Sequence, residues 1–295
     1  MTGVARIKAL EALGRAITPP MIEGTMALFA AAAPRPTPDV CLVRRDLSYG
    51  GDARHRLDVF SPLERSTPRP ALIFVHGGGF VAGDKGGADA PFYNNIGAWA
   101  ARHGCVGVTM TYRLAPGAPW PAGSDDVALA VGWLQQHAAE FGVDPRGLFV
   151  MGQSAGAAHV AGYIADVRHG AAEAVAGAIF MSGIYDLTRL THSPFERAYY
   201  GEDATRFVGQ SSLPGLLATS VPCLYSVAEF DPENFQRQAD QVNAAHLEAT
   251  GALPRMLYFT GHNHLSPALS LGGPDDDIGP SVASFIERFT RPPSR

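Results

Sequence analysis

The sequence predicts an α/β protein built on one doubly wound, mostly parallel sheet of eight strands. Two observations indicate this class. Short strand-like runs alternate with helical stretches, and two of the runs, Ala71–Val75 and Leu148–Met151, are apolar without alternation. Strands that helices cover on both faces show such unbroken apolar runs. The alternating order of strands and helices predicts right-handed crossovers, and therefore a central parallel sheet.

Eight strands and five helices are expected after the first 40 residues. The strands are expected at Cys41–Ser48, Arg56–Ser61, Ala71–His76, Cys105–Thr111, Gly147–Gly152, Val175–Met181, Cys223–Val227 and Arg255–Phe259. The helices are expected at Phe92–His103, Asp125–Phe141, Ala155–Asp166, Glu233–Thr250 and Ser281–Thr290. The segment Thr188–Ser220 shows no clear period and is expected to form an excursion above the sheet.

Residues 1–40 are expected to form a small N-terminal helical segment beside one catalytic domain at 41–295. Two short helices, roughly Val4–Ala16 and Pro20–Ala33, precede a proline-rich link. Apolar side chains of the second helix either pack on the main body or roof a pocket, which makes the segment a candidate cap. One large α/β core is a simpler expectation at this length than two domains.

Composition places the chain among globular proteins, since 46% of its residues are apolar and 17% are charged. A net charge of -5 without a basic stripe argues against nucleic acid or a membrane as a partner. Three cysteines, Cys41, Cys105 and Cys223, lie in apolar runs and are expected to be free thiols. With no signal-peptide pattern, they predict a cytoplasmic protein. Formation of a homo-oligomer stays open.

The strongest motif is Gly152-Gln-Ser-Ala-Gly156, a G-x-S-x-G between an apolar strand and an alanine-rich helix. Its Ser154 is the predicted nucleophile, because a sharp strand-to-helix turn presents the hydroxyl. The flanking glycines are needed because a Cβ there would collide with the neighbouring strand and helix. The Ala155 amide lies at the helix N-terminus and is expected to donate to an oxyanion.

A second motif, His76-Gly-Gly-Gly-Phe80, directly follows the strand that ends at Val75. Three consecutive glycines cost chain entropy and are expected where the backbone must approach a reacting group. The amides of Gly78 and Gly79 are therefore predicted to complete an oxyanion hole, while His76 is expected to be structural. A phosphate-binding loop is a poorer interpretation, because no Gly-Lys-Ser/Thr order follows.

A serine hydroxyl is a poor nucleophile until an imidazole takes its proton. His262 and His264 both follow the last expected strand; chain order favours His264 as the base and leaves His262 as a rim residue. Asp231 and Glu229 follow the preceding strand, and Asp231 is preferred because it lies further along the loop, with Glu229 as the alternative. A metal at the two histidines is not favoured, since further ligands with recognised spacing are absent, and no cofactor is expected.

The order Ser154, Asp231, His264 is that of the α/β-hydrolase fold and differs from the two common protease orders. Three further short motifs accompany these residues: Tyr112-Arg-Leu-Ala-Pro116, Asp125-Asp126 and Asp144-Pro145. On these residues the chain resembles, over about Leu42 to Phe289, the hormone-sensitive-lipase-like esterases and the related arylformamidase (kynurenine formamidase) group. The resemblance implies an acyl-enzyme mechanism without cofactor, in which the segments at Tyr112 and Asp125 support the oxyanion loop.

The resemblance leaves two reactions open, cleavage of small acyl or aryl esters and cleavage of N-formylkynurenine-like formamides. Gln153 and Ala157 depart from the common esterase form G-D-S-A-G-G, and together with Gly83-Asp-Lys85 they favour the formamidase-like branch. A formyl group demands a tight acyl pocket, whereas an esterase accepts longer chains. A non-catalytic binding protein of the same fold predicts a broken set of catalytic residues, and here every member is present.

Overall fold

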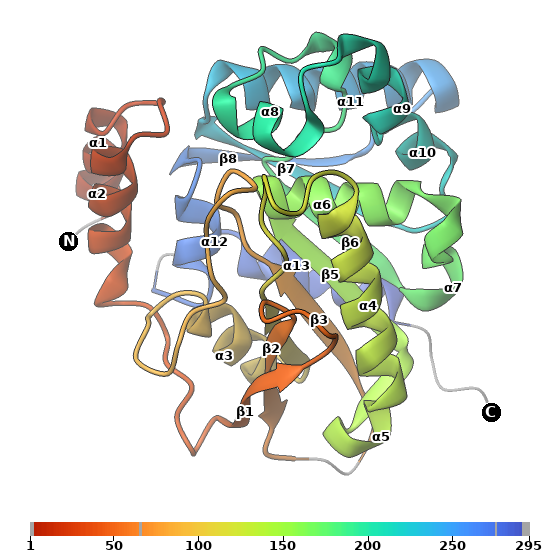
Figure 1. Cartoon of the computed structure of the whole chain (residues 1–295). Helices are drawn as coiled ribbons and strands as arrows, with labels where there is room; N and C mark the ends of the chain where they lie inside the picture. The colour runs from red at the N-terminus through yellow and green to blue at the C-terminus, as the bar shows by residue number, and fades with distance from the viewer. Residues whose placement is uncertain (1–2, 65–66, 275, 291–295) are drawn as a thin grey trace.

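A mixed sheet runs through the middle of the molecule (Figure 1). The computed structural model describes residues 3–64, 67–274 and 276–290, and within them eight strands form one sheet in the order β1-β2-β4-β3-β5-β6-β7-β8. The strands are β1 (Cys41–Ser48), β2 (Arg56–Pro62), β3 (Arg69–Val75), β4 (Val106–Met110), β5 (Val143–Gln153), β6 (Gly177–Met181), β7 (Cys223–Phe230) and β8 (Arg255–Asn263). The sequence predicted all eight, although β5 starts before the expected Gly147 and β8 continues past the expected Phe259.

The sheet is parallel except at one edge. β1 pairs with β2 and β2 with β4 in antiparallel orientation, and every other pair is parallel. The expectation of a mostly parallel, doubly wound sheet is therefore confirmed. Because β3, β5, β7 and β8 run the same way, the loops after their carboxyl ends meet at one edge, where open α/β sheets bind their ligands.

Helices cover both faces of the sheet. Their bounds are α1 (Gly3–Ala12), α2 (Pro19–Ala30), α3 (Asn94–Arg102), α4 (Ala122–Gln136), α5 (Ala138–Phe141), α6 (Ala155–Ala165), α7 (Ala171–Ala174), α8 (Pro194–Tyr200), α9 (Phe207–Gln210), α10 (Leu213–Ala218), α11 (Glu233–Thr250), α12 (Ser266–Ser270) and α13 (Gly279–Phe289). Residues of α4, α6, α10 and α11 share one apolar cluster with β3, and residues of α3, α12 and α13 share another. Ile73 of β3 belongs to the first cluster and its neighbour Phe74 to the second, as the unbroken apolar run predicted.

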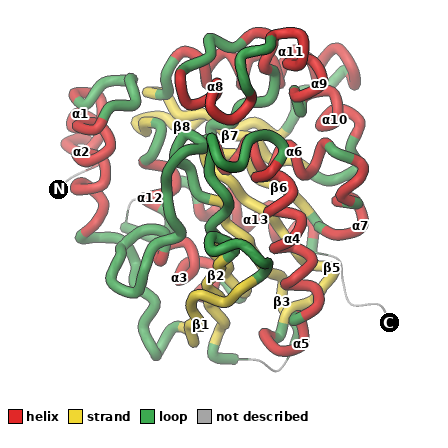
Figure 2. Tube along the Cα trace, in the orientation of Figure 1, coloured by secondary structure: helices red, strands yellow, loops and turns green. Residues whose placement is uncertain are grey.

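The segment expected as an excursion contains the short helices α8, α9 and α10, with a 3-10 turn at Leu187–Arg189 before them and another at Ala204–Arg206. In Figures 1 and 2, α8 and α9 lie at the top of the molecule beside α11, above β7. These helices have four to seven residues, which is too short to show a helical period in the sequence.

The N-terminal helices lie beside the β8 edge of the sheet, at the left of Figure 1. α1 ends at Ala12, earlier than expected, and α2 begins at Pro19 after Thr18, whose side chain caps it. α1 approaches β8 so closely that a Cβ on Gly261 would lie 2.7 Å from Cγ1 of Ile7. α2 packs beside α12.

No helix in the described part of the chain is long and apolar enough to cross a membrane.

Candidate active site

Ser154 occupies the strained turn that the G-x-S-x-G motif predicts. It lies between β5 and α6 with φ 56° and ψ -122°, a region that residues with a Cβ rarely adopt, and its amide donates to the carbonyl of Met181 at 2.8 Å. A Cβ on Gly156 would lie 2.1 Å from the carbonyl oxygen of Val75, and one on Gly152 would lie 2.3 Å from that of Gly156. Both glycines are therefore required for α6 to reach the sheet.

The structure brings His264 and Asp231 to this serine. Nε2 of His264 lies 2.8 Å from Oγ of Ser154, and Nδ1 lies 2.6 Å from Oδ1 of Asp231. The second carboxylate oxygen of Asp231 accepts hydrogen bonds from Oγ of Ser182 at 2.6 Å and from the amide of Ala228 at 2.7 Å. Asp231 is fully buried, so these donors replace the water that an ionised carboxylate requires.

Glu229 takes a different position. Its carboxylate accepts a hydrogen bond from the amide of Gly261 at 2.7 Å, and it is Asp231 that meets the imidazole. His262 does not lie on a rim as expected, because it is buried and its Nδ1 lies 2.9 Å from Oγ of Ser266. His262 is a residue of β8, which continues to Asn263, and not of a loop beyond the expected end of the strand at Phe259. Burial lowers the pKa of its imidazole.

The triple-glycine segment passes in front of the serine. Gly78 and Gly79 have φ values of 135° and 60°, and a Cβ on Gly78 would lie 2.1 Å from the carbonyl oxygen of Ala82. Among residues 3–64, 67–274 and 276–290, none accepts a hydrogen bond from the amides of Gly78, Gly79 or Ala155. These three N–H groups therefore stay free for a ligand.

Gln153 has a role that the motif did not reveal. Its side chain is buried, and Nε2 donates to the carbonyl oxygen of His264 at 2.9 Å. A Cβ on Gly77 would lie 2.4 Å from Oε1 of Gln153, so the same side chain also touches the glycine segment. An aspartate in this position would be shorter and, when ionised, would have no proton to donate. The only sign of this role in the sequence was that Gln153 replaces the aspartate of the common motif.

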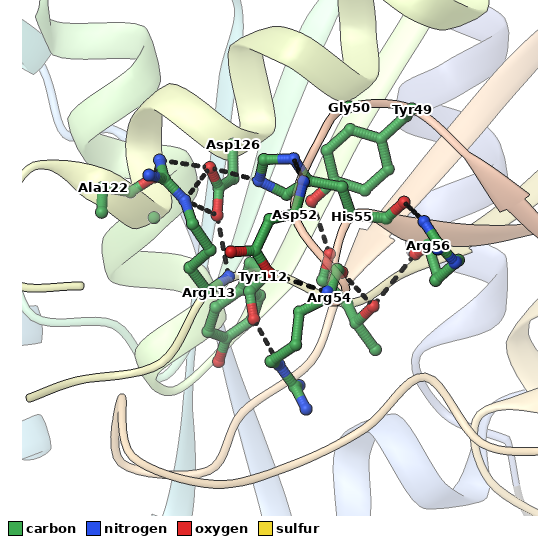
Figure 3. Close-up of polar contacts among 12 residues, drawn as sticks. Tyr49, Gly50, Asp52, Arg54, His55, Arg56, Tyr112, Arg113, Ala122 and Asp126 are labelled. Atoms are coloured by element: carbon green, nitrogen blue, oxygen red, sulfur yellow. Dashed lines mark hydrogen bonds and ion pairs between the residues drawn. The ribbon is translucent and has the colours of Figure 1, made fainter. Parts of the chain in front are cut away.

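A network of polar contacts surrounds the buried carboxylate of Asp126 (Figure 3). Asp126 is fully buried and accepts hydrogen bonds from the backbone and guanidinium of Arg113, and its Oδ1 lies 3.1 Å from Nε2 of His55. The preceding Tyr112 donates its hydroxyl proton to the carbonyl of His76 at 2.9 Å. Asp126 thus fixes the segment that holds His76 at the start of the glycines. Its neighbour Asp125 faces outward toward His169.

Two further histidines are buried beneath the glycine segment. The rings of His76 and Tyr112 are stacked, with centroids 4.4 Å apart, and His159 packs edge-on against Tyr112. His76 uses Nδ1 for the carbonyl of Gly77, whereas neither nitrogen of His159 has a partner among the described residues. Burial lowers the pKa of His76 to about 4 and that of His159 to about 3. Both imidazoles are therefore neutral at neutral pH.

In the described ranges, no group of three or more histidine, cysteine, aspartate or glutamate side chains is arranged to hold a metal ion.

The sheet order, the serine turn and the loops that meet it together define the α/β-hydrolase fold. Solved structures with this fold superimpose over almost the whole chain. A bacterial heroin esterase covers 98% of this chain and 98% of its own, with a TM-score of 0.75 and 21% identity. A hyperthermophilic esterase from the archaeon Pyrobaculum calidifontis covers 98% of both chains, with a TM-score of 0.72 and 20% identity.

The chain belongs to the BD-FAE family, whose model matches residues 57–235, more than half of its length. Esterase LipC of Mycobacterium tuberculosis is 31% identical over 199 residues, which are 61% of this chain and 48% of LipC. Carboxylesterase NlhH of the same organism is 34% identical over 124 residues, 42% of this chain and 37% of NlhH. The chain spans about half or less of the length of these curated relatives. Their names favour the esterase branch of the predicted resemblance and give no support to the arylformamidase branch.

Acid is expected to destabilise the fold through the buried histidines. Both pKa values are lowered from 6.5, so below pH 6.5 the unfolded chain binds protons that the folded chain excludes, and stability falls with falling pH. Each group contributes up to about 1.4 kcal/mol per pH unit until its folded pKa is reached. Urea unfolding of the wild type and of His159→Leu between pH 7 and 4 measures this; the variant should lose less stability. Parallel pH profiles would contradict the role assigned to His159.

Breaking the network of Figure 3 is expected to cost stability. Asp126→Asn keeps the shape of the side chain but leaves the buried donors of Arg113 and His55 without a charged partner, which should lower the free energy of unfolding by about 3 kcal/mol. Asp125→Asn is the matched control, because its half-exposed carboxylate should contribute less than about 1 kcal/mol. Equal unfolding free energies for the two variants would refute this account.

Proposed function

We propose that the protein is a serine hydrolase that cleaves small carboxylic esters through an acyl-enzyme intermediate. The observation that carries the proposal is the continuous hydrogen-bonded path from Oγ of Ser154 through the imidazole of His264 to the carboxylate of Asp231, with distances of 2.8 and 2.6 Å. The names of LipC and NlhH, an esterase and a carboxylesterase, support the same class of reaction.

In the first half of the proposed reaction, Nε2 of His264 takes the proton of Ser154 as Oγ attacks the ester carbonyl. The carboxylate of Asp231 accepts the Nδ1–H, which keeps Nε2 unprotonated before the attack and stabilises the imidazolium afterwards. His264 then gives its proton to the departing alkoxide, and the acyl group stays on Ser154. Water then attacks the acyl carbonyl while His264 takes one of its protons. When this second tetrahedral intermediate collapses, the bond from the acyl carbon to Oγ breaks, His264 returns the proton to Oγ of Ser154, and the acid is released.

The oxyanion of both tetrahedral intermediates is assigned to the amides of Gly78, Gly79 and Ala155. These N–H groups donate to no other group in the described chain, and the first turn of α6 adds the positive end of its dipole at Ala155. Removing one such donor typically costs about 10²- to 10³-fold in rate. Because they are backbone groups held by the fold, they need no reorganisation during the reaction.

The walls of the site favour a small, uncharged substrate. A Cβ on Gly79 would lie 3.2 Å from Cγ of Phe195, so this half-exposed aromatic ring of α8 covers the glycine segment. The ring of Phe235 lies against His264 with centroids 4.2 Å apart. Ser154 itself is only 9% exposed. These aromatic walls offer apolar contact and leave little room around the hydroxyl.

A cysteine nucleophile does not fit the structure. Burial raises the pKa of Cys105 to about 11 and that of Cys223 to about 12, so both thiols stay protonated and inert. All three cysteines are free and buried, which supports the proposal that the protein works in the reducing cytoplasm.

Ser154→Ala should lower kcat/KM for 4-nitrophenyl acetate by at least about 10⁴-fold, because the nucleophile is lost while the oxyanion donors stay. Ser61→Ala is the control, since Ser61 is also buried but lies on β2, away from the site. Initial rates on acetate, butyrate and decanoate esters and on N-formylkynurenine complete the measurement.

Serine-dependent turnover that is fastest on the short esters supports the proposal. A rate that survives in Ser154→Ala would reject Ser154 as the nucleophile. Faster cleavage of N-formylkynurenine than of any ester would assign the same residues to a formamidase.

A further inference from the structure

The inner face of α2 carries one polar side chain in an apolar stripe. Met21, Thr25 and Phe29 follow each other at four-residue intervals, and all three are buried against the body. Thr25 has no exposed surface, so its hydroxyl must find its partners within the protein. It donates to the carbonyl of Met21 at 2.7 Å and accepts a hydrogen bond from Nδ2 of Asn263 at 2.7 Å.

Asn263 is the residue before His264, and both ends of its side-chain amide are in use. Its Oδ1 accepts hydrogen bonds from the amides of Leu265 and Ser266, at 3.2 and 3.1 Å, and Nδ2 donates to Thr25. Only this orientation satisfies the group, because a flipped amide would turn its donor toward two backbone N–H groups. The turn that surrounds His264 is thus attached to α2 through one side chain.

Oγ of Ser266 closes the same turn. It accepts a hydrogen bond from the amide of Asn263 at 3.0 Å and lies 2.9 Å from Nδ1 of His262. The backbone of His264 is also held from the opposite side, where Gln153 donates to its carbonyl. The imidazole therefore has its position set by two supports, one from β5 and one from α2.

The loop that carries Asp231 is attached to the N-terminal segment as well. Arg15, in the connection between α1 and α2, donates to the carbonyl of Glu229 and, at 3.3 Å, to that of Asp231. Its guanidinium lies over the ring of Phe230, 5.7 Å from the centroid. Arg15 is exposed, so we expect this contact to contribute less than the buried one at Thr25.

We propose that α2 is a positioning element of the active site: Thr25 holds Asn263, and through the Asn263 turn it sets where the imidazole of His264 lies relative to Ser154 and Asp231. This inference rests on the proposed function. The proposal gives the N-terminal segment a role other than packing or capping. α2 contacts the residue that precedes His264, whereas the aromatic side chains near Ser154 come from α8 and α11.

Thr25→Val tests the proposal, because it keeps the shape of the side chain and removes the hydroxyl. Nδ2 of Asn263 then has no oxygen acceptor in a buried site, and the turn relaxes. A misplacement of about 1 Å can cost about 10²-fold in rate. We expect kcat for 4-nitrophenyl acetate to fall about tenfold, with KM within about twofold because Thr25 and Asn263 lie outside the substrate walls.

Two variants serve as controls. Thr25→Ser restores the hydroxyl and should return kcat to within about twofold of the wild type. Thr109→Val makes the same change at a threonine of β4 that is equally buried and has no side-chain partner in the described chain, and its kinetics should match the wild type. If Thr25→Val lowers the melting temperature but leaves kcat unchanged well below it, Thr25 only stabilises the fold and the proposal is overturned.

A second measurement needs no turnover and separates this proposal from the proposed function. The proton between Nδ1 of His264 and Oδ1 of Asp231, 2.6 Å apart, should give a low-field NMR signal that Asp231→Asn removes. The signal should shift or broaden in Thr25→Val and stay unchanged in Thr25→Ser and Thr109→Val. An unchanged signal in Thr25→Val overturns the positioning role. A wild type that cleaves no ester overturns the proposed function alone.

Discussion

The whole site depends on the close approach of α6 to β3 just behind Ser154. The Cα of Gly156 rests against the carbonyl of Val75, where even one added carbon would lie 2.1 Å from the oxygen. This approach brings the glycine segment after β3 and the serine turn after β5 to the same point, and it forces Ser154 into a backbone conformation that residues with a Cβ rarely adopt. A strained residue of this kind persists only where its surroundings hold it.

Polar side chains on two sides of the site hold the turn at Ser154 in place. Asp126 fixes Arg113, whose neighbour Tyr112 holds His76 at the start of the glycine segment. On the other side, Gln153 joins the serine turn to the backbone of His264. Asp126, Tyr112, His76 and Gln153 are buried and Arg113 is partly buried, and the hydrogen bonds among them hold the glycine segment and the backbone of His264 in place.

The sequence predicted those parts of the site that local geometry determines. Ser154 and its two glycines follow from the space at one turn, and the eight strands follow from apolar runs. The contacts of Thr25 with Asn263 and of Gln153 with His264 join segments more than a hundred residues apart. No period or spacing encodes such pairs, because they depend on how the elements pack. For the same reason, the sequence could not decide whether the N-terminal helices cover the active site or pack on the main body. The expectation that His262 lies at the rim of the site was wrong, because the side chain is buried.

The central claim is that Ser154 receives the acyl group, and covalent labelling tests it most directly. The protein is treated with a fluorophosphonate, digested with trypsin and analysed by mass spectrometry. The tryptic peptide that spans residues 147–168 contains Ser154 as its only serine. The account predicts one adduct per chain on that peptide, absent from Ser154→Ala and strongly slowed in a variant that lacks the His264 imidazole. An adduct on another residue, or none on a folded wild type, would contradict the account.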